Sequence, residues 1–256
     1  MKSEYELKKD ICEVGRRIYM NGYVAANDGN VSVRISETEV LTTPTGVSKG
    51  FMTPDMIVKA DMDGNVISGK LRPSSELKMH LDVYKNRDDV KSVVHAHPPT
   101  ATGFAVASIP LKEMIMPEVI ITLGTIPVAK YGTPSTMEIP DAVREHLDCY
   151  DAVLLENHGA LTVGTGLFNA YFKMETLELA AKINLTARQL GGIKEISPDN
   201  VEKLYDVRTK LGVEGRHPAT CMDCGSCSVE DNNNIDENEL VALVSEITKK
   251  VMTEIS

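Results

Sequence analysis

The chain has 256 residues, of which 42% are hydrophobic and 25% are charged, and its formal net charge is -10 at pH 7. These values are typical of a globular protein with one large domain, or one domain and an appendage. The acidic balance and the lack of a basic stripe argue against a nucleic-acid partner. The charged start is unlike a signal peptide, and no apolar run approaches the roughly 20 residues of a membrane span. We therefore expect a cytoplasmic protein with no membrane partner.

Helices and strands alternate along the chain, which predicts a mixed α/β domain. Apolar residues at helical spacing predict an amphipathic helix over residues 4–23 and a long helix over 167–190. The other expected elements, in chain order, are a strand over 31–35, a strand over 39–46 that ends in a Pro/Gly turn, a hairpin centred on 63–64, a helix over 73–87, a strand over 90–97, a helix over 100–108, a helix over 140–147, and two buried strands within 151–164 that break at 157–159.

Two histidines one residue apart, His95 and His97, stand at the end of the strand SVVHAH. Pro98 cannot donate a ladder hydrogen bond, so the strand should stop there. Alternate residues of a strand point to the same face, with Cα atoms roughly 6.6 Å apart. That spacing lets two imidazoles bind one cation, although exposed histidines at a strand end would have the same pattern.

A third histidine, His158, follows another apolar run in LLENHGAL. Taken alone it fits a structural role, but with His95 and His97 it would complete a three-histidine zinc site that leaves a position open for substrate. His80 fits a packed or capping role. For His146 and His217 the sequence reveals no partner.

Glu76 stands near the start of the expected helix 73–87, where Ser74 or Ser75 is a suitable N-cap. The helix dipole favours a negative charge there, which is a sufficient structural reason for a carboxylate. The same residue could also act as a general acid/base or as a metal ligand that substrate displaces. The two serines and the turns at Gly29–Asn30 and Thr45–Gly46 could supply donors to an anion.

Five motifs in this order and spacing resemble the class II aldolase/adducin family, and within it the fuculose-phosphate aldolases. They are GNVSVR, LTTPTG, PSSELKMHLDVY, VVHAH and ENHGAL, and the resemblance runs from about residue 5 to about residue 212. It implies a three-layer α/β/α fold with a mainly antiparallel central sheet. It also implies a homotetramer with active sites at the subunit interfaces.

The resemblance also implies the roles of the site residues and the reaction. His95, His97 and His158 would hold one zinc ion per subunit, with Glu76 as catalytic acid/base and resting ligand. A ketose 1-phosphate such as L-fuculose 1-phosphate would be cleaved to dihydroxyacetone phosphate and an aldehyde such as L-lactaldehyde, with zinc as Lewis acid and Glu76 returning a proton to C3. The substrate phosphate would lie against Asn30, Thr45, Gly46, Ser74 and Ser75.

One departure from the family concerns a tyrosine. The fuculose-phosphate aldolases carry a tyrosine from a neighbouring subunit where this chain has LKEMIMPEV, and the equivalent position falls within Met114–Met116. Tyr131 and Tyr205 are candidate replacements, although packing roles fit both. The identity of the sugar phosphate therefore stays open, and a 5-deoxypentulose phosphate is an alternative substrate.

Other activities on the same fold also stay open. A pentulose-phosphate 4-epimerase is disfavoured by Glu in the SSE motif, because those enzymes tend to carry Asp there. A dehydratase of the family would keep the same site. The alternative that is not an enzyme is a non-catalytic, adducin-like scaffold. Loss of the metal-binding histidines would have supported it.

The composition changes near residue 216, so we divide the chain into a catalytic domain over 1–215, a linker over 216–238 and an amphipathic helix over 239–256. A flexible linker that ends in a short amphipathic helix resembles the encapsulation peptides of bacterial microcompartment enzymes. It implies shell or cargo proteins as partners and a place inside such a compartment. A coiled coil or simple docking would produce the same pattern.

Five cysteines, an odd number, do not suggest a secreted disulfide framework. Three of them, Cys221, Cys224 and Cys227, are spaced like metal ligands in CMDCGSC. An iron–sulfur cluster or a second zinc could use them, but only three thiolates stand close together, and reduced linker cysteines fit as well.

Overall fold

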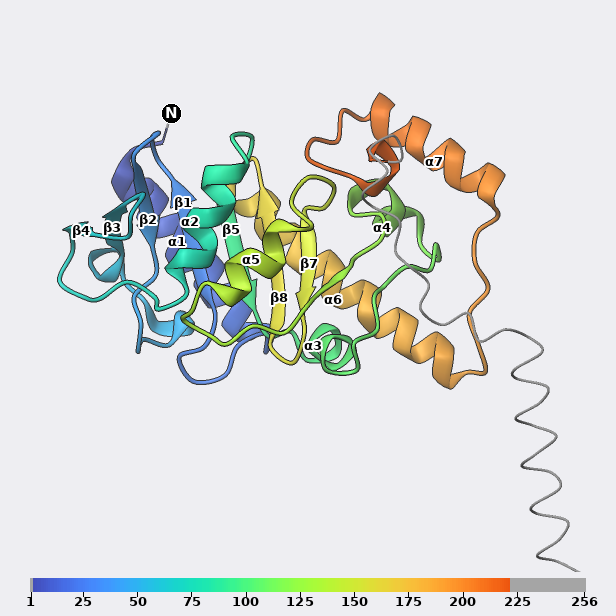
Figure 1. Ribbon diagram of the computed structural model, residues 1–256, viewed down its shortest axis with the longest axis horizontal. Coiled ribbons are helices and arrows are strands. Elements are labelled where there is room, and N and C mark those ends of the chain that lie inside the picture. Colours follow the sequence, from blue (N-terminus) through green and yellow to red (C-terminus); the bar gives the residue numbers. More distant parts are fainter. Residues whose placement is uncertain (1, 222–256) are drawn as a thin grey trace, which may run out of the picture. The chain divides into compact units, whose positions relative to one another are not determined.

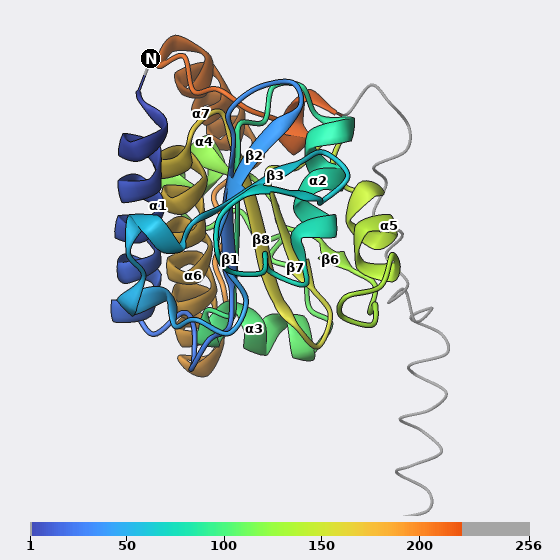
Figure 2. The ribbon, with the colours of Figure 1, turned by 90° about the vertical axis from the view of Figure 1, so that its left-hand side faces the viewer.

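The computed structural model describes residues 2–221, which form three layers: a central sheet with helices on both faces (Figures 1 and 2). The expected α/β/α architecture is therefore confirmed. The rest of the linker, Cys224, Cys227 and the segment 239–256 lie outside the described residues. Among the residues described, no helix is long and apolar enough to cross a membrane.

The sheet has eight strands in the order β4-β3-β2-β1-β5-β8-β7-β6. Neighbouring strands are antiparallel, except that β6 runs parallel to β7. The strands are β1 (Asn30–Arg34), β2 (Glu39–Thr42), β3 (Val58–Asp61), β4 (Val66–Ser68), β5 (Ser92–Ala96), β6 (Val128–Ala129), β7 (Ala152–Leu155) and β8 (Gly159–Gly164).

Helices cover both faces, with α1 and α6 on one side and α2 and α5 on the other (Figure 2). The α-helices are α1 (Glu4–Met20), α2 (Leu77–Asn86), α3 (Pro99–Val106), α4 (Pro117–Thr122), α5 (Glu138–Arg144), α6 (Leu167–Gln189) and α7 (Pro198–Lys210). The short 3-10 helices are η1 (Lys49–Phe51), η2 (Pro54–Met56) and η3 (Pro218–Thr220). The sequence patterns did not indicate α7.

The main core lies between the sheet and the α1/α6 layer. Ile11, Val14 and Ile18 of α1 are fully buried at the predicted helical spacing, as are Met174 and Leu177 of α6. Each such side chain contributes about 1.5–3 kcal/mol by leaving water. The periodicity of α1 was therefore a reliable guide to the face that it buries, whereas α6 also exposes large apolar side chains, Phe172, Leu179 and Leu185.

The opposite face of the sheet carries polar side chains. Ser32 of β1 binds His80 Nδ1 and Tyr84 Oη of α2, each at 2.7 Å. The packed role expected for His80 is thus confirmed, and burial lowers the pKa of His80 to about 4, so it is neutral at pH 7. These contacts hold α2 in place over β1 and β5.

The start of α2 differs from the prediction. The helix begins at Leu77, with Glu76 at the N-cap position, so neither Ser74 nor Ser75 is the N-cap and Glu76 is not in the first turn. The cause is a constraint on the preceding chain: Ser74 N–H donates to Thr43 O at 3.1 Å, and Pro73 forms a bridge with Pro44. These contacts tie the chain before Glu76 to the segment just after β2, and the helix begins only at Leu77.

The expected linker also begins differently. His217 is fully buried and donates from Nε2 to Ile120 O at 2.7 Å, so the chain at this point packs against α4. Cys221 forms a disulfide with Cys149, a pairing that the sequence did not indicate. Contacts with the preceding chain therefore continue past residue 215, into the first residues of the segment expected to be a linker.

Candidate metal centre

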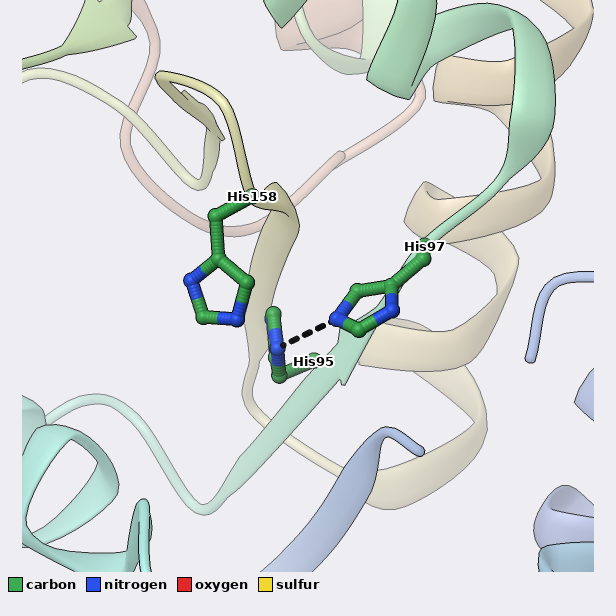
Figure 3. A group of neighbouring side chains, drawn as sticks. All are labelled: His95, His97 and His158. Atoms are coloured by element: carbon green, nitrogen blue, oxygen red, sulfur yellow. Dashed lines mark hydrogen bonds between the residues drawn. The ribbon is translucent and has the colours of Figure 1, made fainter. Parts of the chain in front are cut away.

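The end of β5 presents two histidines to one point. The strand ends at Ala96, and His97 N–H donates to Tyr23 O at 2.8 Å instead of continuing the ladder. His95 and His97 face the same side, as strand alternation predicts, and their Nε2 atoms are 3.2 Å apart (Figure 3).

His158 reaches the same point from the turn between β7 and β8 (Figure 3). The turn depends on Asn157, whose φ of 54° is left-handed, and on Gly159, where a Cβ would lie only 2.6 Å from both Ala96 O and His97 Cδ2. Ligand atoms of the three histidines all lie within 4.8 Å of one another. The structure therefore brings together the three histidines that the sequence indicated as candidate metal ligands.

The protonation of His95 suits a metal ligand. Its Nδ1 donates to Ala160 O at 2.9 Å, which leaves a lone pair on Nε2 facing the other histidines. Burial lowers the pKa of His95 to about 3, and burial also lowers the pKa of His97. Both imidazoles are therefore neutral at pH 7, which is the form that binds a metal.

Glu76 lies against this cluster. Its Oε2 is 3.4 Å from His95 Nε2 and accepts a 2.9 Å hydrogen bond from Asn30 Nδ2, while its Oε1 is 3.2 Å from His158 Nε2. Burial alone would raise the pKa of Glu76, but His95, His158 and the Asn30 amide lower it by more. The pKa lies well below its ordinary value, so the carboxylate is ionised.

The ligand atoms of this cluster are suited to binding a divalent cation. Glu76 Oε1 is buried and has no aligned hydrogen-bond donor, since the nearby His158 Nε2 does not meet it with hydrogen-bond geometry. His95 Nε2 directs a lone pair at the same space. A positive ion would satisfy both atoms, and three imidazoles beside a carboxylate are ligands that zinc accepts.

Thr43 links the segments expected to bind phosphate. It was not among the residues expected at the site. Thr43 Oγ1 accepts from Val31 N–H at 3.1 Å, Thr43 N–H donates to Val31 O at 3.0 Å, and Thr43 O accepts from Ser74 N–H. The start of β1, the end of β2 and the approach to α2 therefore lie side by side. Its sequence signal was weak, because a buried threonine at a strand end is common.

The five expected phosphate-binding residues belong to these adjacent segments. Thr45 N–H donates to Arg72 O at 3.0 Å, which joins the Thr45–Gly46 turn to the chain before Ser74. Gly46 has a φ of 72°, and both turn residues are exposed. Ser75 is exposed, while the Asn30 amide is committed to Glu76.

The two candidate replacements for the missing tyrosine lie in different settings. Tyr131 is 56% exposed, and its backbone N–H donates to Glu156 Oε2 at 2.8 Å. Tyr205 is on α7, where its ring packs against His217 with centroids 5.4 Å apart. Position 116, at the N-cap of α4, is a methionine and brings no hydroxyl group.

Comparisons with known proteins agree with this architecture. Residues 9–185 match the family model described as Class II Aldolase and Adducin N-terminal domain. An L-fuculose phosphate aldolase of Methanococcus maripaludis is 36% identical over 181 residues, which cover 71% of this chain and 97% of that protein. A 3-oxo-tetronate 4-phosphate decarboxylase of Haemophilus influenzae is 32% identical over 183 residues, covering 70% and 87%.

A solved structure is similar across most of the described residues. It is an L-fuculose 1-phosphate aldolase that superposes with a TM-score of 0.75 at 30% identity and covers 82% of this chain and 98% of its own. The matched region contains the histidines, Glu76 and the adjacent segments around Thr43. From its sequence and its fold, this chain belongs to the class II aldolase and adducin family.

Proposed function

We propose that this protein is a zinc-dependent aldolase that cleaves a ketose 1-phosphate of the L-fuculose 1-phosphate type to dihydroxyacetone phosphate and an aldehyde such as L-lactaldehyde. The observation that carries the proposal is the position of Glu76, an ionised, mostly buried carboxylate between His95 and His158. The similarity to the L-fuculose phosphate aldolases described above also supports the proposal.

His95, His97 and His158 would hold the zinc ion, which as a Lewis acid polarises the substrate carbonyl. Glu76, within 3.4 Å of His95 Nε2 and 3.2 Å of His158 Nε2, would lie beside a substrate bound at the metal and could move a proton at its reacting carbon. In the synthetic direction the ionised carboxylate would remove a proton from C3 of dihydroxyacetone phosphate. In the cleavage direction it would first take up the proton that leaves the C4 hydroxyl and then return it to C3. Asn30 holds the carboxylate in place through its amide.

The phosphate of the substrate would bind where the three linked segments meet. The exposed Thr45, Gly46 and Ser75 and the half-buried Ser74 would offer hydroxyl groups and the N–H groups of Gly46 and Ser75, since the N–H groups of Thr45 and Ser74 already donate to Arg72 O and Thr43 O. Asn30 would border the phosphate on the side of Glu76. An anion bound there would be anchored while the carbonyl end of the substrate reaches the histidines.

Release of dihydroxyacetone phosphate tests the proposal directly. L-fuculose, L-rhamnulose and 5-deoxyribulose 1-phosphates would each be tested with added zinc, with a chelator, and with Glu76→Gln. We expect zinc-dependent release that the substitution abolishes, and the fastest substrate identifies the sugar. No release from any substrate, with zinc bound at the histidines, would reject the aldolase.

A second candidate is decarboxylation of a 3-oxo sugar acid phosphate, and the lack of a side-chain hydroxyl group throughout Met114–Met116 favours it. Aldol cleavage needs a group that removes the proton of the leaving aldehyde's hydroxyl. Loss of carbon dioxide needs no such group, although both reactions leave a carbanion beside a carbonyl. The decarboxylase among the relatives supports this candidate. Carbon dioxide release from 3-oxo-tetronate 4-phosphates, with no dihydroxyacetone phosphate from ketose phosphates, would establish it.

The 4-epimerase and dehydratase alternatives keep the same metal site and are separated by their products. A scaffold without catalysis has no need of three histidines around an ionised carboxylate. Zinc content near zero, with no turnover of any of these substrates, would be the result that favours the scaffold.

Assembly and location are proposals as well. We expect a homotetramer whose active sites are completed across subunit interfaces, as light scattering of the purified protein would test. The sequence of 239–256 places apolar residues at helical spacing, and this pattern supports the proposal of encapsulation. A fluorescent protein fused to 239–256 should enter microcompartments, and a fusion with Ile247→Asp should not.

A further inference from the structure

A cavity of about 830 Å³ lies between the starts of α1 and α6, at the end of the sheet away from the histidines. Its volume is within the range of small-molecule sites. Its borders include Val33 of β1, Ser92 of β5, Leu7 of α1 and Phe168 of α6. Ser92 begins β5 and His95 lies near its other end, and strand alternation turns these two side chains to opposite faces of the sheet. The cavity is therefore separate from the metal centre.

A fully buried hydroxyl group at this cavity has no partner. Ser92 is 0% exposed, and among the described residues no group forms a hydrogen bond with its Oγ. Its side chain shares a face of β5 with the core residues Val94 and Ala96, and this is the face that α1 and α6 cover (Figure 2). Asn169 Oδ1, at the wall formed by α6, is also buried and unpaired within the described structure. Buried polar atoms are seldom left without a partner, so both atoms indicate that a polar group of a ligand belongs here.

The first turn of α6 borders the same cavity. Its N-cap residue, Gly166, has no side chain that could cap the helix, and a Cβ there would meet no atom within 4 Å. The N–H groups of Leu167, Phe168 and Asn169 have no acceptor within the helix, because they precede the first helical carbonyl partner. The dipole of this helix of 23 residues adds a positive potential at the same place. The start of α6 is therefore suited to an anionic group.

The charged side chains around the cavity also favour an anion. Three acidic side chains border it, and each has a basic partner: Glu4 is 2.6 Å from Lys59, Asp10 is 2.6 Å from Lys2, and Glu37 is 3.3 Å from Arg34. Lys91 also borders the cavity, and within the described structure its Nζ donates to a carbonyl oxygen, that of Asp88, and to no carboxylate. The charge of Lys91 and the dipole of α6 are thus left without a negative partner.

We propose that this cavity binds a small organic acid with an apolar body, at a site independent of the aldolase reaction. The anionic group lies at the start of α6, where it accepts hydrogen bonds from the first-turn N–H groups and from Ser92 Oγ. Lys91 adds a positive charge. The apolar body packs against Val33 and Phe168, and a donor group on it pairs with Asn169 Oδ1.

Two fluorescent probes that differ by one charged group test the proposal. 8-Anilinonaphthalene-1-sulfonate and N-phenyl-1-naphthylamine have the same two aromatic systems joined through an N–H group, and only the first is an anion. Each probe is titrated into the zinc-loaded, full-length protein. We expect saturable binding of one sulfonate per chain. The neutral probe should bind about 10–100-fold more weakly, as for loss of hydrogen bonds to a charged group.

Substitutions at Gly166 locate the site. In Gly166→Asp the new carboxylate would cap the first-turn N–H groups and repel an anion, so the dissociation constant of the sulfonate should rise about 10–100-fold. Asp is a preferred N-cap, so the stability of this variant to urea should be unchanged or higher, which excludes unfolding as the cause. Gly166→Ala is the matched control, because it adds a Cβ in open space without a cap and should bind the sulfonate normally.

A second pair of variants tests the charge. Lys91→Met should weaken binding of the sulfonate but not of the neutral probe, whereas Lys203→Met, on α7, should change neither. Equal affinity of the unmodified protein for the two probes would overturn the proposal, as would full sulfonate binding by Gly166→Asp. Loss of sulfonate binding on removal of zinc would assign the anion to the metal centre and reject this site. The lack of any saturable sulfonate binding would reject it as well.

Discussion

Asn30 and His95 lie directly opposite each other on β1 and β5, and both side chains approach the same atom, Oε2 of Glu76, at 2.9 and 3.4 Å. The sheet register therefore sets the position of the carboxylate relative to the metal ligands. A shift of one residue between β1 and β5 would turn Asn30 to the other face and release Glu76.

The hydrogen bond from Asn30 should matter for catalysis. Asn30→Ala removes a bond to a charged group, worth about 1.5–3 kcal/mol, so kcat/KM should fall about 10–100-fold. Asn65→Ala is the matched control, because Asn65 donates to Asp61 Oδ2 at the same 2.9 Å in an exposed hairpin. Equal activity of the two variants would show that Asn30 does not position Glu76.

The three histidines should be needed for metal binding. His97→Ala leaves two imidazoles and should lose the bound zinc, together with nearly all activity, as elemental analysis and turnover would show. His146→Ala is the control, since His146 lies outside the cluster and packs against Tyr150. A chelator should reproduce the effect in the unmodified protein, and added zinc should reverse it. Full metal content in His97→Ala would contradict the assignment.

Gly159 should be required for the approach of β8 to β5. In Gly159→Ala the new Cβ would lie 2.6 Å from Ala96 O and from His97 Cδ2, so it must displace a ligand or separate the strands. We expect zinc affinity to fall about 10–100-fold, as for loss of a residue that orients a ligand. A competition titration measures it. Gly166→Ala has no atom near the new Cβ and should bind zinc normally.

His217 should make stability depend on pH. Its folded pKa of about 4 lies below the unfolded value, so the unfolded chain binds more protons between these values and stability falls as pH falls through that window. At about pH 5 the loss from this group should be about 2 kcal/mol relative to about pH 7.5.

Urea unfolding of metal-free protein at the two pH values measures this effect. His217→Gln keeps a donor for Ile120 O but cannot be protonated, so its stability should fall less in acid. The other histidines titrate equally in both proteins, so the difference between the two losses isolates His217. An identical loss in the variant would show that His217 does not contribute.

Local patterns predicted much of this fold, because strand alternation and helical periodicity are properties of neighbouring residues. The shared face of His95 and His97 follows from their spacing alone, and the buried stripes of α1 and α6 follow from theirs. Family motifs added His158 and Glu76 to the expected site. The start of α2 was predicted wrongly, because a hydrogen bond from Ser74 to Thr43 overrides the preference of serine for an N-cap.

Contacts between distant residues had no such local signal. The approach of His158 to His95, the turn of Glu76 toward Asn30 and the pairing of Cys149 with Cys221 all depend on strand order and on which segments pack together. Composition and spacing therefore identified the kinds of ligand that the chain carries. Only the tertiary structure decided which of them meet, because side chains converge on one point through the sheet and its covering helices.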